Sequence, residues 1–217
     1  GNLPLYFIKN DGQIDNKVKF YEKSSGHSIF FTEDGIYMTM TKNLVEGKLS
    51  IDNPKKFNDE LKAKNTKKAK SEVVKLTPLN AKKKVEIVAE NEQSGRVNYF
   101  IGNDPKKWKA DIPTYQKVRY KGIYEGVDIV FYGSNNQLEY DIIAQPGADI
   151  SKIAFESEGI KELKISEEGD LIAILPSGES VIQKKPAVYQ ISEDGSNISI
   201  KGDYRIIEAG QKYVFDF

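Results

Sequence analysis

The sequence predicts an all-β fold, in which antiparallel strands and hairpins form a sandwich or twisted meander sheets with one or two short helices. Two observations support this class. The 217 residues include 12 Tyr and 10 Phe, and 39% of the chain is hydrophobic; aromatic and β-branched residues suit the half-buried surface of a sheet. Short apolar runs also alternate with turns that contain glycine, which is the pattern of hairpins.

The first clear hairpin spans residues 27–41. Ile36, Met38 and Met40 alternate with Tyr and Thr, and a period of two indicates a half-buried strand. Gly35 follows an acidic pair and can supply the positive φ of a short hairpin loop. The same turn chemistry recurs at residues 166–169 and 192–195.

A second hairpin is predicted over residues 127–144. Alternating apolar residues occur on both sides of a Gly-Ser-Asn-Asn turn at 133–136. From residue 152 onward, closely spaced strands predict a consecutive meander. Its expected strands are 152–157, 162–166, 171–175, 179–184, 187–192, 198–207 and 211–217.

Only two short helical signals interrupt the strands. Asn53 can cap a helix that begins at Pro54, and the Asp104-Pro105 pair can open a single turn that carries Trp108. Residues 55–84 contain 11 Lys and three acids, with Phe57 as the only aromatic residue. This composition predicts a solvated excursion, because a nucleic-acid site would interleave Arg or aromatic residues.

These patterns predict one structural domain with three segments. Residues 1–45 form N-terminal hairpins, 46–72 form the Lys-rich variable excursion, and 73–217 form the main β body. With 32 basic and 32 acidic side chains the net charge is zero, so we expect neither nucleic acid nor an anionic membrane as partner. No apolar run approaches the ~20 residues of a membrane-spanning helix.

The first residues lack an initiator Met and a leader-like apolar segment. We therefore expect a secreted or cell-surface protein whose signal peptide has been removed. The chain has no cysteine, so disulfides, thiol catalysis and Cys-based metal sites are excluded.

Catalytic and metal-binding signatures are missing from the sequence. His27 is the only histidine, no Gly-x-Ser-x-Gly elbow exists, and a surface or strand-start position is the simplest interpretation of His27. Residues 10–13, Asn-Asp-Gly-Gln, have the composition of a tight polar turn, with side-chain oxygens that a metal could also use. We expect no enzyme activity, no cofactor and no metal.

The one carboxylate set that could support catalysis is Asp128, Glu139 and Asp141. These residues could converge across the 127–144 hairpin, and paired carboxylates hydrolyse glycosidic bonds. The alternative is that they lie on a solvent-facing strand surface and pair with basic residues of the preceding strand. The candidate partners are Lys117, Arg119 and Lys121.

Several aromatic residues form a second candidate site. Trp108, Tyr115, Tyr120, Tyr124 and Tyr132 lie close together in sequence. Such side chains form sugar-binding platforms, and they also fill the cores of β-sandwiches. Burial of an indole is strongly favourable, so we expect Trp108 to pack on the sheet.

Residues 96–108 also carry a specific family signature, which includes NYFIGNDPKKW from 98 to 108. Together with further motifs in the same order, it resembles a bacterial exported domain that precedes SBBP-type β-propeller repeats and is usually treated as a domain of unknown function. The further motifs lie at 10–13, 118–120, 123–133, 137–141, 146–149 and 185–190.

This resemblance implies a module that precedes repeats or immunoglobulin-like domains on secreted or surface-anchored proteins. It supplies no catalytic residues, so none is carried over. The leading functional hypothesis is therefore a non-catalytic interaction or structural module, whose partners are flanking domains of the same protein or an extracellular glycan or protein. The alternatives are a glycan-binding module that uses Trp108 and nearby Tyr residues, and a carboxylate-dependent glycosidase.

Overall fold

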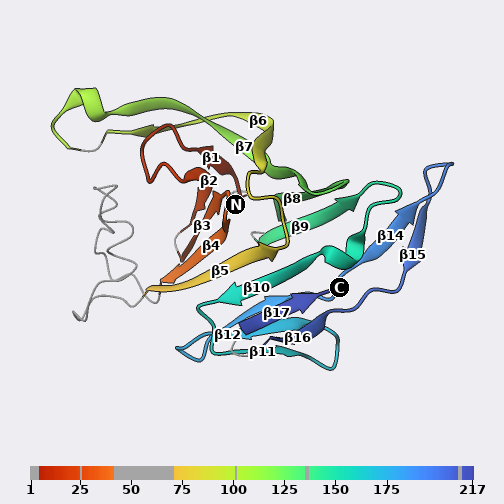
Figure 1. Ribbon diagram of the computed structural model, residues 1–217. Helices are drawn as coiled ribbons and strands as arrows, with labels where there is room; N and C mark the ends of the chain where they lie inside the picture. The colour runs from red at the N-terminus through yellow and green to blue at the C-terminus, as the bar shows by residue number, and fades with distance from the viewer. Residues whose placement is uncertain (1–4, 25, 42–70, 101, 135–136, 210–211) are drawn as a thin grey trace. The chain divides into compact units, whose positions relative to one another are not determined.

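The computed structural model describes residues 5–24, 26–41, 71–100, 102–134, 137–209 and 212–217 (Figure 1). These residues form antiparallel strands, and the only helical elements among them are two 3-10 turns, η1 (Pro105–Lys107) and η2 (Ile150–Lys152). The predicted all-β class is confirmed. The helix predicted at Asn53 lies outside the described residues, as does the Lys-rich excursion except for its last two residues.

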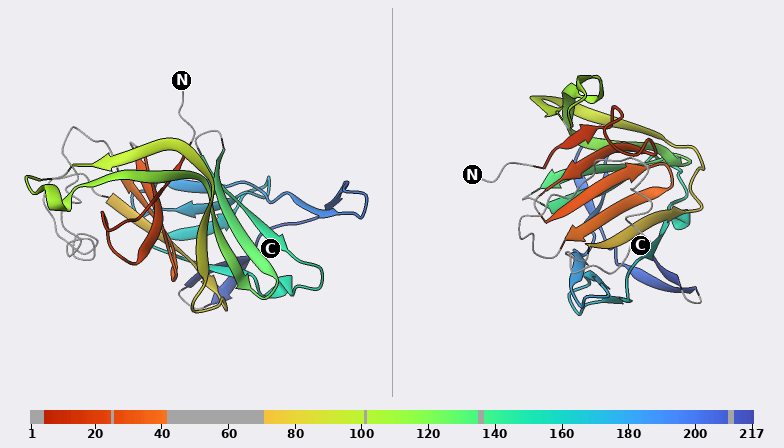
Figure 2. Two further views of the ribbon diagram at one scale, coloured as in Figure 1. Left: turned by 90° about the horizontal axis from the view of Figure 1, so that it is seen from above. Right: turned by 90° about the vertical axis from the view of Figure 1, so that its left-hand side faces the viewer.

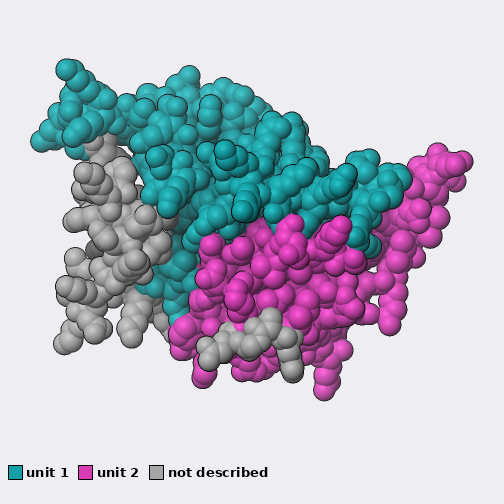
Figure 3. All heavy atoms as spheres, viewed as in Figure 1, with its two compact units in different colours: residues 1–73, 81–150 teal, residues 74–80, 151–217 magenta. Residues whose placement is uncertain are grey.

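The chain divides into two compact units, coloured separately in Figure 3. Unit 1 comprises Gly1–Val73 and Ala81–Ile150, and unit 2 comprises Val74–Asn80 and Ser151–Phe217. The division into segments 1–45, 46–72 and 73–217 stays a prediction. No helix among the described residues has the length and apolar character needed to cross a membrane.

Unit 1 is built on a sheet with strand order β4-β3-β2-β1-β7-β8-β9, and β6 pairs with β7. The long β6–β7 hairpin carries η1 at its tip, away from β8 and β9 (Figure 2). The strands are β1 (Phe7–Lys9), β2 (Val18–Lys23), β3 (His27–Thr32), β4 (Gly35–Thr41), β6 (Glu86–Tyr99), β7 (Lys109–Tyr124), β8 (Val127–Ser134) and β9 (Gln137–Ala144).

An aromatic core fills one face of the unit 1 sheet. The Phe31 ring lies 5.3 Å from the rings of both Phe7 and Phe131, and Tyr120 lies 5.8 Å from Phe131. All four side chains are at most 2% exposed. The Tyr120 hydroxyl donates to the Thr32 carbonyl at 2.9 Å, so burial of this phenol leaves no donor without a partner.

The opposite face of β1–β3 is also covered. Neighbours of the core residues, such as Ile8, Tyr21 and Phe30, form a second buried cluster with Ile112 of β7. Successive side chains of a strand point to opposite faces, so these strands have apolar residues on both sides. The Tyr21 hydroxyl lies 2.8 Å from that of Tyr99 on β6.

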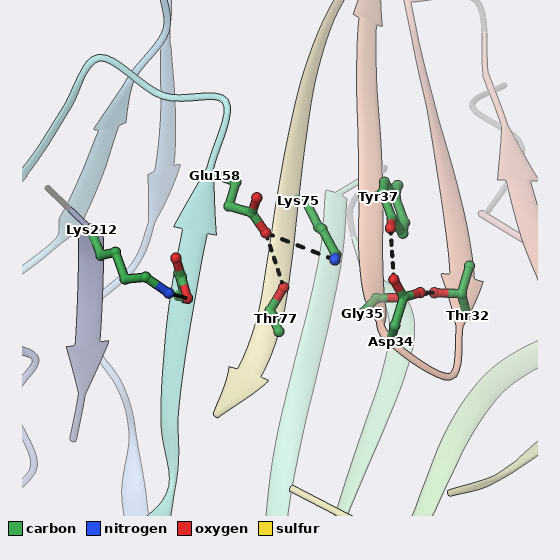
Figure 4. A network of polar contacts seen from close by, with 9 residues as sticks. Thr32, Asp34, Gly35, Tyr37, Lys75, Thr77, Glu158 and Lys212 are labelled. Carbon is green, nitrogen blue, oxygen red and sulfur yellow. Dashed lines mark hydrogen bonds and ion pairs between the residues drawn. The ribbon is translucent and has the colours of Figure 1, made fainter. Parts of the chain in front are cut away.

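The β3–β4 turn shows why this hairpin closes where the sequence predicts. Gly35 has φ +147°, a conformation that side chains rarely adopt. Asp34 holds the turn, because its carboxylate contacts the Thr32 hydroxyl at 2.6 Å and accepts a hydrogen bond from the Tyr37 hydroxyl at 3.0 Å (Figure 4).

Unit 2 contains three separate antiparallel groups. These are the path β16-β17-β10-β5, the three-stranded sheet β11-β12-β13 and the two-stranded β14-β15 ribbon. The strands are β5 (Ser71–Leu79, from Val74 in this unit), β10 (Ala154–Glu158), β11 (Glu162–Ile165), β12 (Leu171–Ile174), β13 (Ser180–Gln183), β14 (Val188–Ile191), β15 (Asn197–Ile200), β16 (Arg205–Ala209) and β17 (Lys212–Asp216).

The predicted consecutive meander is therefore wrong. The β10 strand pairs with β5 and β17 rather than with β11, and the expected strand 198–207 is two strands, β15 and β16. Stacking of Phe155 on Phe215 at 5.5 Å buries both rings and favours the long-range β10–β17 pairing. Glu158 of β10 contacts Lys75 and Thr77 of β5, as Figure 4 shows.

Candidate functional site

The three candidate carboxylates lie on one face of the β8–β9 hairpin. In the register, Asp128 is opposite Ile143, Asp141 is opposite Val130, and Glu139 is opposite Tyr132. Directly paired residues share a face, so all three carboxylates project from one side of this hairpin. However, each carboxylate is opposite an apolar or aromatic residue rather than another acid.

Asp128 belongs to a connected set of ion pairs, Glu90–Arg119–Asp128, which we call the ion-pair ladder. Its carboxylate accepts hydrogen bonds from the Gly122 amide at 2.7 Å and from Arg119 Nη1 at 3.1 Å. The same guanidinium donates from Nε and Nη2 to both carboxylate oxygens of Glu90 on β6, at 2.5 and 3.2 Å. These charged hydrogen bonds lower the pKa of the Glu90 carboxyl and raise the pKa of Arg119. Arg119 thus ties three neighbouring strands together.

Asp141 and Glu139 are exposed beside Tyr132. The Tyr132 hydroxyl donates to Asp141 Oδ1 at 3.0 Å, and the Lys117 ammonium lies 5.7 Å from the centre of its ring. Burial, followed by the Asp141 hydrogen bond, raises the pKa of Tyr132 to about 12. The phenol therefore stays protonated and donates to the acid, which is an arrangement that stabilises a solvent-facing sheet surface.

Three of the candidate aromatic residues belong to the folded body rather than to a ligand platform. Tyr120 and Tyr124 are 1% and 4% exposed. Tyr115 is half-buried and packs edge-on against Phe20 of β2 at 6.0 Å. Tyr120 and Tyr124 lie in the core and Tyr115 lies at its rim, as the packing alternative expects, and ligand binding by Tyr115 stays a prediction.

Trp108 differs from its expected placement. It lies at the tip of the β6–β7 hairpin and is 41% exposed, so the prediction that it packs on the sheet is wrong. Its ring contacts Phe100 edge-on at 5.4 Å, and Phe100 is 61% exposed. The Trp108 Nε1 donates to the Gly102 carbonyl at 3.1 Å. The bend that allows this contact places Gly102 at φ +76°, which favours glycine. An exposed aromatic pair results.

The β14–β15 ribbon is an exposed apolar surface that was not predicted from the sequence. Its two strands pair only with each other among the described residues. Its large apolar side chains are between 36% and 66% exposed, namely Val188, Tyr189, Ile191, Ile198 and Ile200. Apolar runs separated by a glycine-containing turn predicted strands here, but such runs do not show whether anything covers the strands.

A shallow groove of about 400 Å³ lies at the base of this ribbon. Residues from Lys185 to Tyr189 line one side, and residues from Ser199 to Gly202 line the other. A Cβ atom at residue 202 would collide with the Val188 side chain, so glycine is required for this close approach of the two chain segments. The groove is open and partly apolar, and it continues the exposed surface of the ribbon.

A buried acid on β2 was likewise not predicted from the sequence. Glu22 is 2% exposed. The Ser24 hydroxyl donates to Oε1, whereas Oε2 has no hydrogen-bond partner and lies 3.4 Å from His27 Nε2. Burial raises the pKa of the Glu22 carboxyl, against the lowering effects of Ser24 and His27. His27 is the first residue of β3, as its strand-start interpretation expects.

The polar segment at residues 10–13 uses its side chains within the fold. Asn10 Nδ2 donates to the carbonyls of Asp15 at 2.7 Å and Val18 at 2.8 Å. Gln13 Nε2 donates to the Lys9 carbonyl at 2.7 Å. The tight-turn interpretation accounts for these contacts. Across the residues that the structure describes, no group of three or more His, Cys, Asp or Glu side chains could hold a metal ion.

Comparison with known proteins assigns a family and no activity. No curated protein and no solved structure matches the chain significantly. A family model described as a domain of unknown function, DUF7948, matches residues 7–217. Because this match covers more than half of the sequence, the chain belongs to the DUF7948 family.

Proposed function

We propose that this domain is a non-catalytic interaction module of a secreted or cell-surface protein. Its β14–β15 ribbon is the contact surface, and its partner is an adjoining β-rich repeat or immunoglobulin-like domain of the same polypeptide. The NYFIGNDPKKW resemblance, to domains that precede such modules in exported proteins, supports this context.

The exposed apolar ribbon is the observation that carries the proposal. Val188, Ile198 and Ile200 project from one face, because Val188 is opposite Ile200 and Ile198 is opposite Gln190. Tyr189 and Ile191 project from the other face. Full burial of one such side chain contributes roughly 1.5–3 kcal/mol, so several together would supply a substantial part of a binding free energy.

The ribbon also offers unpaired backbone groups. Each of its two strands has one edge without a strand partner among the described residues. An added strand would satisfy these N–H and C=O groups while its alternate side chains contact the apolar residues of the ribbon. A β-rich neighbouring domain provides such a strand. An isolated two-stranded ribbon is only marginally stable in water, so docking would also stabilise it.

Thermal unfolding in two contexts tests this proposal. The variant combines Val188→Ser, Ile198→Ser and Ile200→Ser and is compared with the parent, both as this domain alone and within the full-length gene product. We expect little change in Tm for the isolated domain and a clear decrease for this domain within the full-length protein. Lys164→Ser on β11 is a surface control, and it should leave Tm unchanged in both the isolated domain and the full-length protein. An equal change in Tm of the triple variant in the isolated domain and in the full-length protein would overturn the proposal.

The exposed Phe100–Trp108 pair favours a second candidate function, glycan binding. Indole and phenyl rings at a hairpin tip can stack on the apolar face of a sugar. Retention on immobilised oligosaccharides tests this candidate, with Trp108→Ala and Phe100→Ala as variants and Tyr189→Ala as the control. Loss of retention in the first two variants alone would establish the tip as the binding surface; absence of retention in the parent would exclude it for those glycans.

A further inference from the structure

A small group of possible metal donors converges on the core-facing side of β2, β3 and β4. Glu22 of β2 is opposite Ile29 of β3, and His27 of β3 is opposite Met40 of β4. Ile29 is also opposite Met38. Paired residues share a face, and residues two apart on a strand share it too. The only histidine of the chain and both of its methionines therefore project from the same face as the buried acid.

The contact between Glu22 and His27 has the geometry of two ligands on one ion. Glu22 Oε2 lies 3.4 Å from His27 Nε2, yet this oxygen has no hydrogen-bond partner. Two ligands with bonds of about 2.0–2.1 Å to one ion lie roughly 2.8–3.4 Å apart, and this distance grows as the angle at the ion opens from about 90° to the tetrahedral value. An ion between them would satisfy the buried oxygen, which otherwise costs free energy.

The surroundings orient both groups. The Ser24 hydroxyl donates to Glu22 Oε1, so the other oxygen is directed at His27. Metal-ligating carboxylates are commonly held by a hydrogen bond of this kind. The Glu22 side chain is only 3% exposed, whereas that of His27 is 36% exposed. An ion from solvent can therefore bind the exposed imidazole first and then reach the buried oxygen beside it.

Met40 supplies the donor that selects the ion. Side chains directly opposite each other in an antiparallel pair have Cβ atoms about 4.5–5.5 Å apart, so the Met40 thioether is within reach of an ion on the His27 ring. Thioether and imidazole together favour copper over Mg²⁺ and Ca²⁺, which prefer oxygen ligands. Cu²⁺ also has the highest affinity of the divalent first-row ions for mixed donor sets.

We propose that Glu22 Oε2, His27 Nε2 and the Met40 thioether form a copper site at the rim of the unit 1 core. Glu22 and His27 are the principal ligands, Met40 is a weaker third ligand, and Ser24 is a positioning residue. This site is independent of the β14–β15 ribbon and of the function proposed for it.

Titration of the purified protein with CuCl₂ in a non-coordinating buffer tests the site. We expect one equivalent to bind and its electron paramagnetic resonance spectrum to show coupling to one imidazole nitrogen. His27→Gln should remove that coupling, and Glu22→Gln should weaken binding by more than about tenfold. Ser24→Ala should weaken it about 10–100-fold with the nitrogen coupling retained. Circular dichroism of each variant without copper checks that it is folded.

One control and one further ligand variant separate the site from general surface binding. Glu33→Gln removes an exposed acid of the same hairpin, paired with Lys19 at 3.1 Å, and should leave copper affinity unchanged. Met40→Leu preserves volume and should weaken binding of Ag⁺, a redox-inert thioether-seeking ion, by about tenfold or more. No bound equivalent in the parent, or equal copper binding by parent, Glu22→Gln and His27→Gln, would overturn the site and leave Glu22 and His27 as an ion pair.

Discussion

The β8 and β14 strands are both rich in apolar residues but have opposite surroundings. In β8, Val127, Ile129 and Phe131 are at most 2% exposed, because β8 lies between β7 and β9 and faces the aromatic core. In β14, Val188 and Ile191 are 36% and 66% exposed, because β15 is its only strand partner among the described residues. β-branched and aromatic content therefore predicts a strand, whereas burial depends on tertiary partners. An apolar strand without such partners indicates a contact surface.

The largest expected difference between the two strands is in stability. Phe131→Ala should lower the free energy of unfolding by about 3–5 kcal/mol, since it leaves a cavity among Phe31, Tyr120 and Tyr140. Ile191→Ala in the isolated domain should change it by less than about 0.5 kcal/mol. Urea unfolding measures both. A large loss for Ile191→Ala would show that the ribbon is packed in solution, and would break the comparison.

The ion-pair ladder of the β8 face should contribute less than its apolar core. Arg119→Ala leaves Glu90 and Asp128 without their shared partner, and we expect a loss of about 1–3 kcal/mol in the free energy of unfolding. Lys19→Ala is the control, because its ion pair with Glu33 is exposed and should contribute less than about 1 kcal/mol. Equal losses in urea unfolding would contradict the anchoring role of Arg119.

Because Glu22 is buried, we expect the free energy of unfolding to depend on pH, by about 1 kcal/mol for each pH unit by which the folded-state pKa is raised. Burial raises the pKa of this carboxyl in the folded state, so the folded protein binds the proton more tightly than the unfolded chain. Stability from this group is complete below the unfolded value of about 4.3 and is lost as pH rises through the folded pKa. Without metal, Glu22→Gln should therefore gain stability relative to the parent as pH rises above about 4.3. A difference in the free energy of unfolding between the parent and Glu22→Gln that stays constant from about pH 4 to 7 would refute this.

A small effect is also expected at the hairpin tip. Trp108→Ala removes one edge-on contact with Phe100 and one hydrogen bond to Gly102. Because the indole is 41% exposed, we expect a loss of about 1 kcal/mol in the free energy of unfolding. Native tryptophan fluorescence should be quenched readily by acrylamide. Blue-shifted, protected emission would place the indole in a packed environment instead.

Local features of this fold could be predicted from the sequence. The 27–41 and 127–144 hairpins and the turn after Asp104 follow from alternation and turn residues that act over a few positions. The pairing of β10 with β17 could not be predicted, because it depends on packing between Phe155 and Phe215, which are far apart in sequence. The exposure of Trp108 and the burial of Glu22 likewise depend on which elements lie nearby.

For the carboxylate site as well, the local arrangement could be predicted from the sequence and the long-range contacts could not. Alternation correctly placed Asp128, Glu139 and Asp141 on one face, but the role of Asp128 follows from Arg119 and Gly122, which reach it through strand pairing and the β7–β8 turn. The sequence named Arg119 only as one of three possible partners. The contacts of an acid, rather than its position in a pattern, determine what it does.

Hydrogen–deuterium exchange most directly tests the claim that the ribbon is a contact surface. Amide exchange of residues 188–191 and 197–200 would be measured in the isolated domain and in the full-length gene product. We predict that these amides exchange readily in the isolated domain and become protected in the full-length protein, while the tip at 102–108 is unchanged. Identical exchange of the ribbon in both proteins would contradict the account.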